Sequence, residues 1–411
     1  MWRPEIPWPA VRGYGLTLGL TVLLGLTVLG SLSLVACGSD PSPESSTAPE
    51  EIRIGVLASF AVGFISDGPE VLRGANLALE HINADGGIVL DGVRVPVRLI
   101  IEEDLGQPEI AAVKAAKLIS VDRVAALMGL PVSNSAVTAA QIAQQHRILA
   151  LSTTSTHPET TRGKDLIFRM TYTDDFQAKI LAELAWGRLG ARRAALLVDG
   201  GSAYSLSFAQ HFTETFEGLG GQVVLEQPFT LDDVDEDRHF ERIAEVAPDA
   251  LVIPVNTPFV ETLVQRLQGR SERYDVLGGD TWDGAAFETV DDRQRLFFAN
   301  VWSTIAAEGH SRDFVELCQE RFGEPPKVSM ALSYDALNLL AQAIERAGTL
   351  ESEALRDALL NLGTYPGVAG DLEFVDGSGD PRREAVIVEV LPSAQRRVVH
   401  RIGHSTSGAS D

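Results

Sequence analysis

The sequence has few cysteines and few basic residues, and each shortage excludes a class of protein. It contains only two cysteines, Cys37 and Cys318, so it can build neither a disulfide-rich scaffold nor a metal site of four cysteines. Its 34 lysines and arginines are outnumbered by 57 aspartates and glutamates, which leaves a net charge of -23 at pH 7. Since a negative field of this size repels phosphate groups, we expect no nucleic-acid partner.

The sequence also lacks the motifs of the common enzyme and metal-binding classes. Its eight histidines show no metal-ligand spacing, and the Gly-x-Ser-x-Gly motif of serine hydrolases is missing. No phosphate-loop lysine follows Gly200 and Gly201, and the acidic turn 376–380 has Ile387 where a calcium loop needs glutamate. We therefore predict that the protein is not an enzyme and has neither a cofactor nor a metal site.

A charge-free apolar segment lies near the N-terminus. Residues 13–36 carry no charged side chain and follow two arginines, which is the pattern of a secretory signal peptide. The segment ends in Leu-Val-Ala-Cys at 34–37, which resembles the bacterial lipoprotein box, so we expect a lipid on Cys37. Three prolines and no apolar period predict a flexible linker over 37–51. An uncleaved membrane helix is the alternative, and either interpretation places the rest of the chain outside the cytoplasmic membrane.

Beyond the linker, short apolar runs of strand length alternate with longer segments of helical period. A chain of 411 residues has room for two domains, and the alternation runs from residue 52 to about 302, restarting near 166. This pattern predicts an α/β fold of two similar doubly wound lobes with parallel central sheets. After about residue 311 the pattern is helical, and it ends in short strands that we expect to complete the two lobes.

Polar residues follow several of the predicted strands. In open α/β sheets, ligands bind beyond the carboxyl ends of the strands. Ser133 follows one strand at the start of a predicted helix, a run of hydroxyl residues at 152–156 follows the next, and Asp280 follows a later one. A small carboxylate could bind at the helix start and an ammonium group at Asp280. Ordinary capping or turn roles explain Ser133 and Asp280 equally well.

A set of short motifs follows the same order as in a known family. The motifs are Ile52–Leu57, Arg73–Ala75, Ile82–Ile88, Gly129–Ser135, Ser152–Thr156 with Pro158 and Glu159, Phe168 with Arg169, Gly370–Asp376, and Gly379 with Asp380. Together they resemble the type I periplasmic solute-binding proteins of the leucine/isoleucine/valine-binding group, which feed ABC importers. The resemblance covers roughly residues 52–395. It implies that Ser133, Thr154 and Thr156 hold the carboxylate of an amino acid, and that Asp280 and the carbonyl side of the loop at 154–156 hold its ammonium group. Ser155 is a further candidate ligand-binding residue.

The resemblance also implies contacts to the rest of the ligand, where this sequence departs from the family. Tyr204 corresponds to an aromatic residue that closes over the ligand, whereas Asn256 stands where the family has a second aromatic residue. Val132 occupies a position of a family disulfide that this chain cannot form. We expect a pocket floor unlike the branched-chain amino-acid pattern, with Phe64 and Trp282 selecting the side chain of the ligand.

In that family the chain crosses three times between two lobes that close over the ligand. We place the crossings near 172–174, 303–306 and 373–376. The expected segments are a signal peptide at 1–36, a lipid-anchored linker at 37–51, an N-terminal lobe of 52–172 plus 304–374, a C-terminal lobe of 173–303 plus 375–404, and a disordered tail at 405–411. Closure about such a hinge couples ligand affinity to domain motion.

These observations predict a monomeric, lipid-anchored, extracytoplasmic solute-binding protein. It would capture an amino acid or a related small carboxylate and deliver it to ABC permease subunits. Two alternatives keep the fold: a ligand-sensing subunit that presents its closed form to a membrane receptor, and a binder of aromatic acids, aliphatic acids or amides. A purely structural role in the cell envelope would require no ligand.

Overall fold

The computed structural model describes residues 49–60, 68–230, 236–257, 259–267, 270–287, 290, 294–392 and 394–403. The predicted signal peptide, the predicted lipidation site Cys37 and the predicted selectivity residue Phe64 lie outside these ranges. In the part of the chain that is described, no helix is both long and apolar enough to cross a bilayer.

The first half of the described chain forms a parallel sheet of five strands. Their order is β4 (Val97–Glu103), β1 (Ile52–Ala58), β5 (Ala126–Gly129), β6 (Ala150–Ser152) and β7 (Ile167–Arg169). Successive side chains of a strand point to opposite faces, so Ile54 and Val56 of β1 enter one hydrophobic cluster and Leu57 enters another. Burial of both faces explains why β1 is an almost continuous apolar run.

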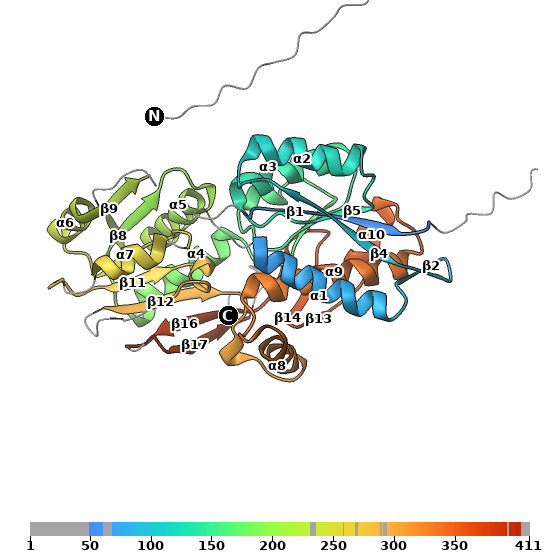
Figure 1. Ribbon diagram of the computed structural model, residues 1–411. Helices are drawn as coiled ribbons and strands as arrows, with labels where there is room; N and C mark the ends of the chain where they lie inside the picture. The colour runs from blue at the N-terminus through green and yellow to red at the C-terminus, as the bar shows by residue number, and fades with distance from the viewer. Residues whose placement is uncertain are drawn as a thin grey trace, which may run out of the picture. The chain divides into compact units, whose positions relative to one another are not determined.

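Helices cover both faces of this sheet (Figure 1). They are α1 (Gly68–Ala84), α2 (Pro108–Ser120) and α3 (Ser133–Gln145), joined from later in the chain by α9 (Val328–Ala347) and α10 (Ser352–Leu360). Ala111 of α2 and Ala136 of α3 pack in the same cluster as Leu57, whereas residues of α1 and α9 share the cluster of Ile54. Gly74 lets α1 approach α9 closely, since a side chain there would collide with the Met330 carbonyl.

The second sheet has a parallel part and an antiparallel edge. Its order is β17 (Arg396–Ile402), β16 (Ala385–Val390), β12 (Arg295–Asn300), β11 (Asp275–Gly278), β10 (Ala250–Val252), β8 (Arg193–Asp199) and β9 (Gln222–Phe229). The strands from β9 to β12 pair in parallel, and β16 and β17 pair antiparallel. Its accompanying helices are α4 (Asp174–Glu183) with a π-helical extension η2 (Leu184–Arg188), α5 (Ala203–Gly218), α6 (Glu236–Val246) and α7 (Phe259–Leu267).

Shorter elements complete the described chain. They are the hairpin β2 (Ile88–Leu90) and β3 (Val93–Val95), the antiparallel sheet β13 (Tyr365–Gly367), β14 (Gly370–Phe374) and β15 (Pro381–Arg383), the helix α8 (His310–Phe322), and the 3₁₀ turns η1 (Pro158–Thr160), η3 (Asp280–Trp282) and η4 (Thr304–Ala306).

The chain passes between the surroundings of the two sheets three times. It leaves β7 for α4, leaves β12 for α8 and α9, and leaves β15 for β16. This arrangement confirms the predicted α/β class with two parallel central sheets. At the third passage the chain leaves β15, which pairs with β14, and after Glu384 enters β16, which pairs with β12 of the second sheet. The assignment of individual segments to two lobes stays a prediction.

Candidate ligand-binding site

A small polar pocket lies where loops after strands of both sheets meet the first turns of α3 and α5. It is lined by Pro131, Val132, Ser133, Asn134, Thr154, Thr156, Ser202, Tyr204, Asn256 and Thr281. Eight of these ten side chains are polar, and none of the ten is charged. The free volume is about 40 Å³, room for only a few water molecules. A ligand as large as an amino acid therefore needs the two sides to move apart before it can enter.

The first side of the pocket is the turn between β5 and α3. Gly129 and Leu130 both have positive φ angles, 97° and 50°, and this turn directs the chain into α3. Val132 occupies the N-cap position, and no side chain caps the helix. Ser133 is thus the first helical residue and not an N-cap. The backbone N–H groups of the first turn lack a capping side chain, and such groups bind anions well.

The hydroxyl-rich loop after β6 lies against this helix start. Thr154 donates a hydrogen bond from Oγ1 to the Pro131 carbonyl at 3.2 Å. Ser155 Oγ donates to Ser133 Oγ at 3.1 Å and also bonds Thr160 Oγ1 at 2.9 Å. Three predicted residues, Ser133, Thr154 and Thr156, line the pocket, whereas Ser155 is buried behind it and supports Ser133.

A fully buried arginine fixes this loop. Arg169 of β7 donates from Nη1 to the Ser155 carbonyl at 2.9 Å and from Nη2 to the His157 carbonyl at 3.1 Å. Its Nε forms an ion pair with Asp380 at 2.6 Å. The turn between β14 and β15 thereby holds the loop in place through Arg169.

The second side of the pocket comes from loops of the second sheet. Ser202 caps α5 by accepting a hydrogen bond from the Ser205 N–H at 3.2 Å, and Tyr204 lies in the first turn of that helix. Asn256, which follows β10, donates from Nδ2 to Ser202 Oγ at 3.4 Å. Thr281 of η3 donates to the Val255 carbonyl at 2.9 Å. Tyr204 and Asn256 were predicted, whereas Ser202 and Thr281 were missed although they also follow strands.

Asn134 bridges the two sides. Its Nδ2 donates to the Gly201 carbonyl at 2.9 Å, and its Oδ1 accepts from the Ala203 N–H at 2.8 Å. One amide therefore joins the first turn of α3 to the first turn of α5. Asn134 was not among the predicted site residues, although it stands between two serines at the helix start.

Asp280, the predicted partner of the ammonium group, does not line the pocket. Its backbone N–H donates to Gln177 Oε1 at 3.2 Å. Burial in the first place, and the nearby Asp280 carboxylate in the second, raise the pKa of Tyr172 and of Tyr204 well above the usual tyrosine value. Tyr204 itself lines the pocket, and the backbone of Gly279, next to Asp280, packs against its hydroxyl.

Trp282 does not belong to the pocket, which corrects the expectation that it selects the ligand. Its side chain is fully buried, and its indole N–H donates to the Ile253 carbonyl at 3.1 Å. Its ring packs against Phe287 and Phe298 in the core of the second sheet. A large aromatic ring with its one polar group satisfied is stable there.

A larger cavity of about 630 Å³ lies beside the second and third passages of the chain and contains none of the predicted site residues. Several of its charged side chains pair with one another: Arg382 lies 3.9 Å from Glu373, and Arg401 lies 3.5 Å from Glu308 and 3.6 Å from Glu384. The smaller pocket is the candidate ligand site, because there the ends of parallel strands and an uncapped helix start converge.

Metal-binding groups do not gather in the part of the chain that the structure covers. Within those residues, no three histidine, cysteine, aspartate or glutamate side chains are placed to hold an ion. Cys318 of α8 is buried, and burial raises the pKa of its thiol to about 12, so it is an unreactive packing residue.

Comparison with known proteins places this geometry in a family. The sequence profile of the periplasmic binding proteins matches residues 51–395. The Leu/Ile/Val-binding protein BraC3 of Rhizobium johnstonii is 25% identical over 328 residues, which cover 79% of this chain and 87% of BraC3. The structure of the leucine-binding protein LivK from Thermotoga maritima has a TM-score of 0.76 and 26% identity, and covers 86% of this chain and 99% of that one.

A more distant structure has the same fold and contains a bound aromatic acid. It is a solute-binding protein of an ABC transporter from Rhodopseudomonas palustris BisB5 in complex with 3,4-dihydroxy benzoic acid, at a TM-score of 0.75 and 18% identity, covering 86% of this chain and 98% of that one. The chain described here belongs to the periplasmic binding protein family, and within it to the type I solute-binding proteins of ABC transporters.

Proposed function

We propose that this protein captures an amino acid in the pocket between α3 and α5 and delivers it to an ABC importer. The observation that carries the proposal is the pairing of two unlike ends. The uncapped start of α3, with Ser133, Thr154 and Thr156 around it, suits a carboxylate. On the opposite side, Asp280 directly follows Gly279, whose backbone packs against the Tyr204 hydroxyl of the pocket, and its carboxylate suits an ammonium group.

The relatives support an amino-acid ligand. BraC3 is named for binding leucine, isoleucine and valine, and the Thermotoga maritima protein is named for binding leucine. Family membership supports a location outside the cytoplasm. A lipid anchor on Cys37 rests on the lipoprotein-like motif at 34–37 alone, and it would keep a monomeric protein close to its permease.

A carboxylic acid without an ammonium group is the second candidate. None of the ten residues that line the pocket carries a charge, so an acid could bind through its carboxylate and be surrounded by hydroxyl and amide groups. The Rhodopseudomonas palustris structure contains such an acid. A sensing role would use the same site and differ only in the membrane partner.

A thermal-shift panel on the refolded, ligand-free protein separates the two candidates. The panel pairs each amino acid with its des-amino acid, for example L-leucine with 4-methylpentanoic acid. A ligand at 100 times its Kd adds about 2.7 kcal/mol of stability. We expect stabilisation by at least one amino acid and a weaker effect from its des-amino form.

A variant of Asp280 tests the ammonium end directly. Loss of a charged partner costs about 1.5–3 kcal/mol, so Asp280→Asn should weaken amino-acid binding about 10- to 100-fold and leave the des-amino acid unaffected. Asp175→Asn, at an exposed position of α4, is the matched control. Unchanged amino-acid affinity in Asp280→Asn would remove Asp280 from the site, and a panel without any response would refute the amino-acid assignment.

A further inference from the structure

The first turn of α4 contacts residues from both ends of the candidate site. Asp174 begins this helix, and its backbone N–H donates to the Thr156 carbonyl at 2.8 Å. Asp174 is completely buried, as is Gln177 one turn later. The helix start is thus attached to the loop that carries Thr156, one of the hydroxyl residues of the carboxylate end.

Gln177 connects this helix to the opposite end of the site. Its Nε2 donates to Asp174 Oδ1 at 3.0 Å, and its Oε1 accepts from the Asp280 N–H at 3.2 Å. The hydrogen bonds therefore run without interruption from Thr156 through Asp174 and Gln177 to Asp280. We call these four residues the buried relay.

The backbone beside Asp280 is shaped to receive the glutamine. A side chain at Gly279 would lie 2.7 Å from Gln177 Oε1 and would also collide with the Tyr204 hydroxyl. Only glycine lets this loop approach Gln177 and Tyr204 so closely. Gln177 therefore holds the backbone of Asp280 in place, and Tyr204 packs against the backbone of the adjacent Gly279.

Only an amide fits both contacts. The Asp174 carboxylate requires a donor, and the Asp280 N–H requires an acceptor. Glutamate at position 177 would place a second carboxylate against Asp174, and methionine would remove both of these hydrogen bonds. We propose that Gln177 is a positioning residue that holds Asp280 in register with Thr156 and so sets the preference for ligands that carry an ammonium group. This inference rests on the proposed function, because it assigns Asp280 to the ammonium end.

Paired ligands measure the effect of Gln177. Titration calorimetry gives the Kd of L-leucine and of 4-methylpentanoic acid for the wild type and for Gln177→Met, which is similar in size. We expect the leucine affinity to fall at least 10-fold and the acid affinity to change less than 3-fold. Gln210→Met, at an exposed position of α5, should change neither. An equal loss for both ligands, or no loss for either, would overturn the proposal.

Gly279→Ala perturbs the same contact from the other side and serves if Gln177→Met does not fold. It should lower the leucine affinity selectively in the same way, and an equal effect on both ligands would count against the relay.

Hydrogen exchange separates a failure of this inference from a failure of the proposed function. Exchange of the Asp280 N–H depends on Gln177 whatever the ligand is, and should accelerate at least 10-fold in Gln177→Met. Unchanged exchange would refute the positioning role even if amino acids bind. Faster exchange in a protein whose wild type prefers 4-methylpentanoic acid would uphold the contact and refute the role of Asp280 as an ammonium partner, and with it the specificity that we assign to Gln177.

Discussion

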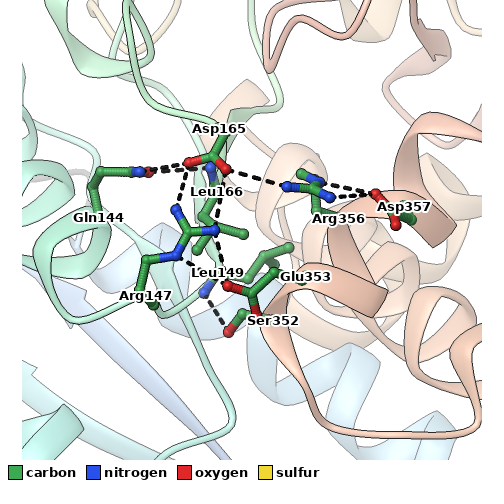
Figure 2. A network of polar contacts seen from close by, with 9 residues as sticks. All are labelled: Gln144, Arg147, Leu149, Asp165, Leu166, Ser352, Glu353, Arg356 and Asp357. Atoms are coloured by element: carbon green, nitrogen blue, oxygen red, sulfur yellow. Dashed lines mark hydrogen bonds and ion pairs between the residues drawn. The ribbon is translucent and has the colours of Figure 1, made fainter.

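The protein contains two polar networks that each include an aspartate and a glutamine, an exposed one that also contains arginines and a largely buried one that contains none. Figure 2 shows the exposed network, in which Asp165 is surrounded by Gln144, Arg147 and Arg356. Arg147 lies 2.8 Å from Asp165 and 2.8 Å from Glu353 of α10, and all three side chains are nearly half exposed. The buried relay runs from Thr156 to Asp280, and its Asp174 has no exposed surface.

The two networks shift the pKa of an aspartate in opposite directions. Hydrogen bonds from Arg147 and then from Gln144 hold the pKa of Asp165 well below its usual range. Burial raises the pKa of Asp174 to about 6, although hydrogen bonds from Thr156, Ser207 and Gln177 oppose the rise. The causes differ, because hydrogen bonds from arginine and glutamine favour the charged form of Asp165, whereas loss of hydration on burial favours the neutral form of Asp174. We therefore expect substitutions in the exposed network to change the free energy of unfolding little, and substitutions in the buried relay to change it more.

The largest expected effect comes from leaving a buried charge without its partner. Asp380→Ala removes the carboxylate that pairs with Arg169, whose side chain is fully buried. Loss of one partner of a fully buried pair costs about 3–5 kcal/mol, and Asp380 is itself 38% exposed, so we expect a decrease of about 3 kcal/mol in the free energy of unfolding, measured by denaturant titration. Asp371→Ala, at an exposed position of β14, is the control. A loss below about 1 kcal/mol would show that the ion pair of Arg169 and Asp380 contributes no more than an exposed ion pair.

An intermediate effect comes from the titration of Asp174. Its pKa is raised to about 6 in the folded protein from 3.8, so the folded state binds the proton more tightly than the unfolded state. Asp174 thus makes stability fall as the pH rises from about 4 to about 6, with no further change above. Asp174→Asn should remove this term, and the variant should gain stability relative to the wild type by about 2–3 kcal/mol across that window.

The difference between variant and wild type isolates Asp174 from other groups. Burial also raises the pKa of Asp335 to about 6 and lowers the pKa of His157, but both groups are present in the variant and in the wild type. Denaturant titrations at pH 4, 5, 6 and 7 provide the measurement, with Asp175→Asn as the control. A stability difference that does not vary with pH would show that Asp174 titrates like an exposed carboxylate.

The smallest effect is expected in the exposed network. Asp165→Asn breaks the pairs with Arg147 and Arg356, which lie at 2.8 and 3.2 Å. Exposed pairs contribute about 0–1 kcal/mol and weaken with salt. Denaturant titration in 0.05 M and 0.5 M sodium chloride (about 14 and 4 Å of screening length) should therefore detect less than about 1 kcal/mol, and less still at high salt. A loss above about 2 kcal/mol would erase the contrast between the two networks.

The regular part of the structure was predictable from the sequence. The apolar run at 52–57 is β1, and the helix predicted to start at Ser133 is α3, from Ser133 to Gln145. Both follow from hydrophobic period, since a strand covered on two faces must be apolar throughout and a surface helix only along one side. Several polar residues that follow predicted strands line one pocket, because strand ends in parallel sheets gather at one edge.

The detailed membership of the site was not predictable in this way. Asp280, Thr281 and Trp282 are consecutive in sequence, and all three follow β11. Because η3 is a 3₁₀ turn with three residues per turn, their side chains point in three directions. Thr281 lines the pocket, Trp282 enters the core, and the backbone N–H of Asp280 donates to Gln177 Oε1. A linear pattern cannot tell these apart.

The α/β class, the order of strands and helices, and the family follow from local hydrophobic period and short motifs. The contacts of Asn134 with α5, of Gln177 with Asp174 and Asp280, and of Arg169 with Asp380 arise only when the chain folds. Apart from the contact between Gln177 and Asp174, which both lie in α4, these contacts join parts of the molecule that are scores of positions apart along the chain. Their partners are chosen by how the packed elements bring polar groups together away from water, and a buried polar group must find such a partner.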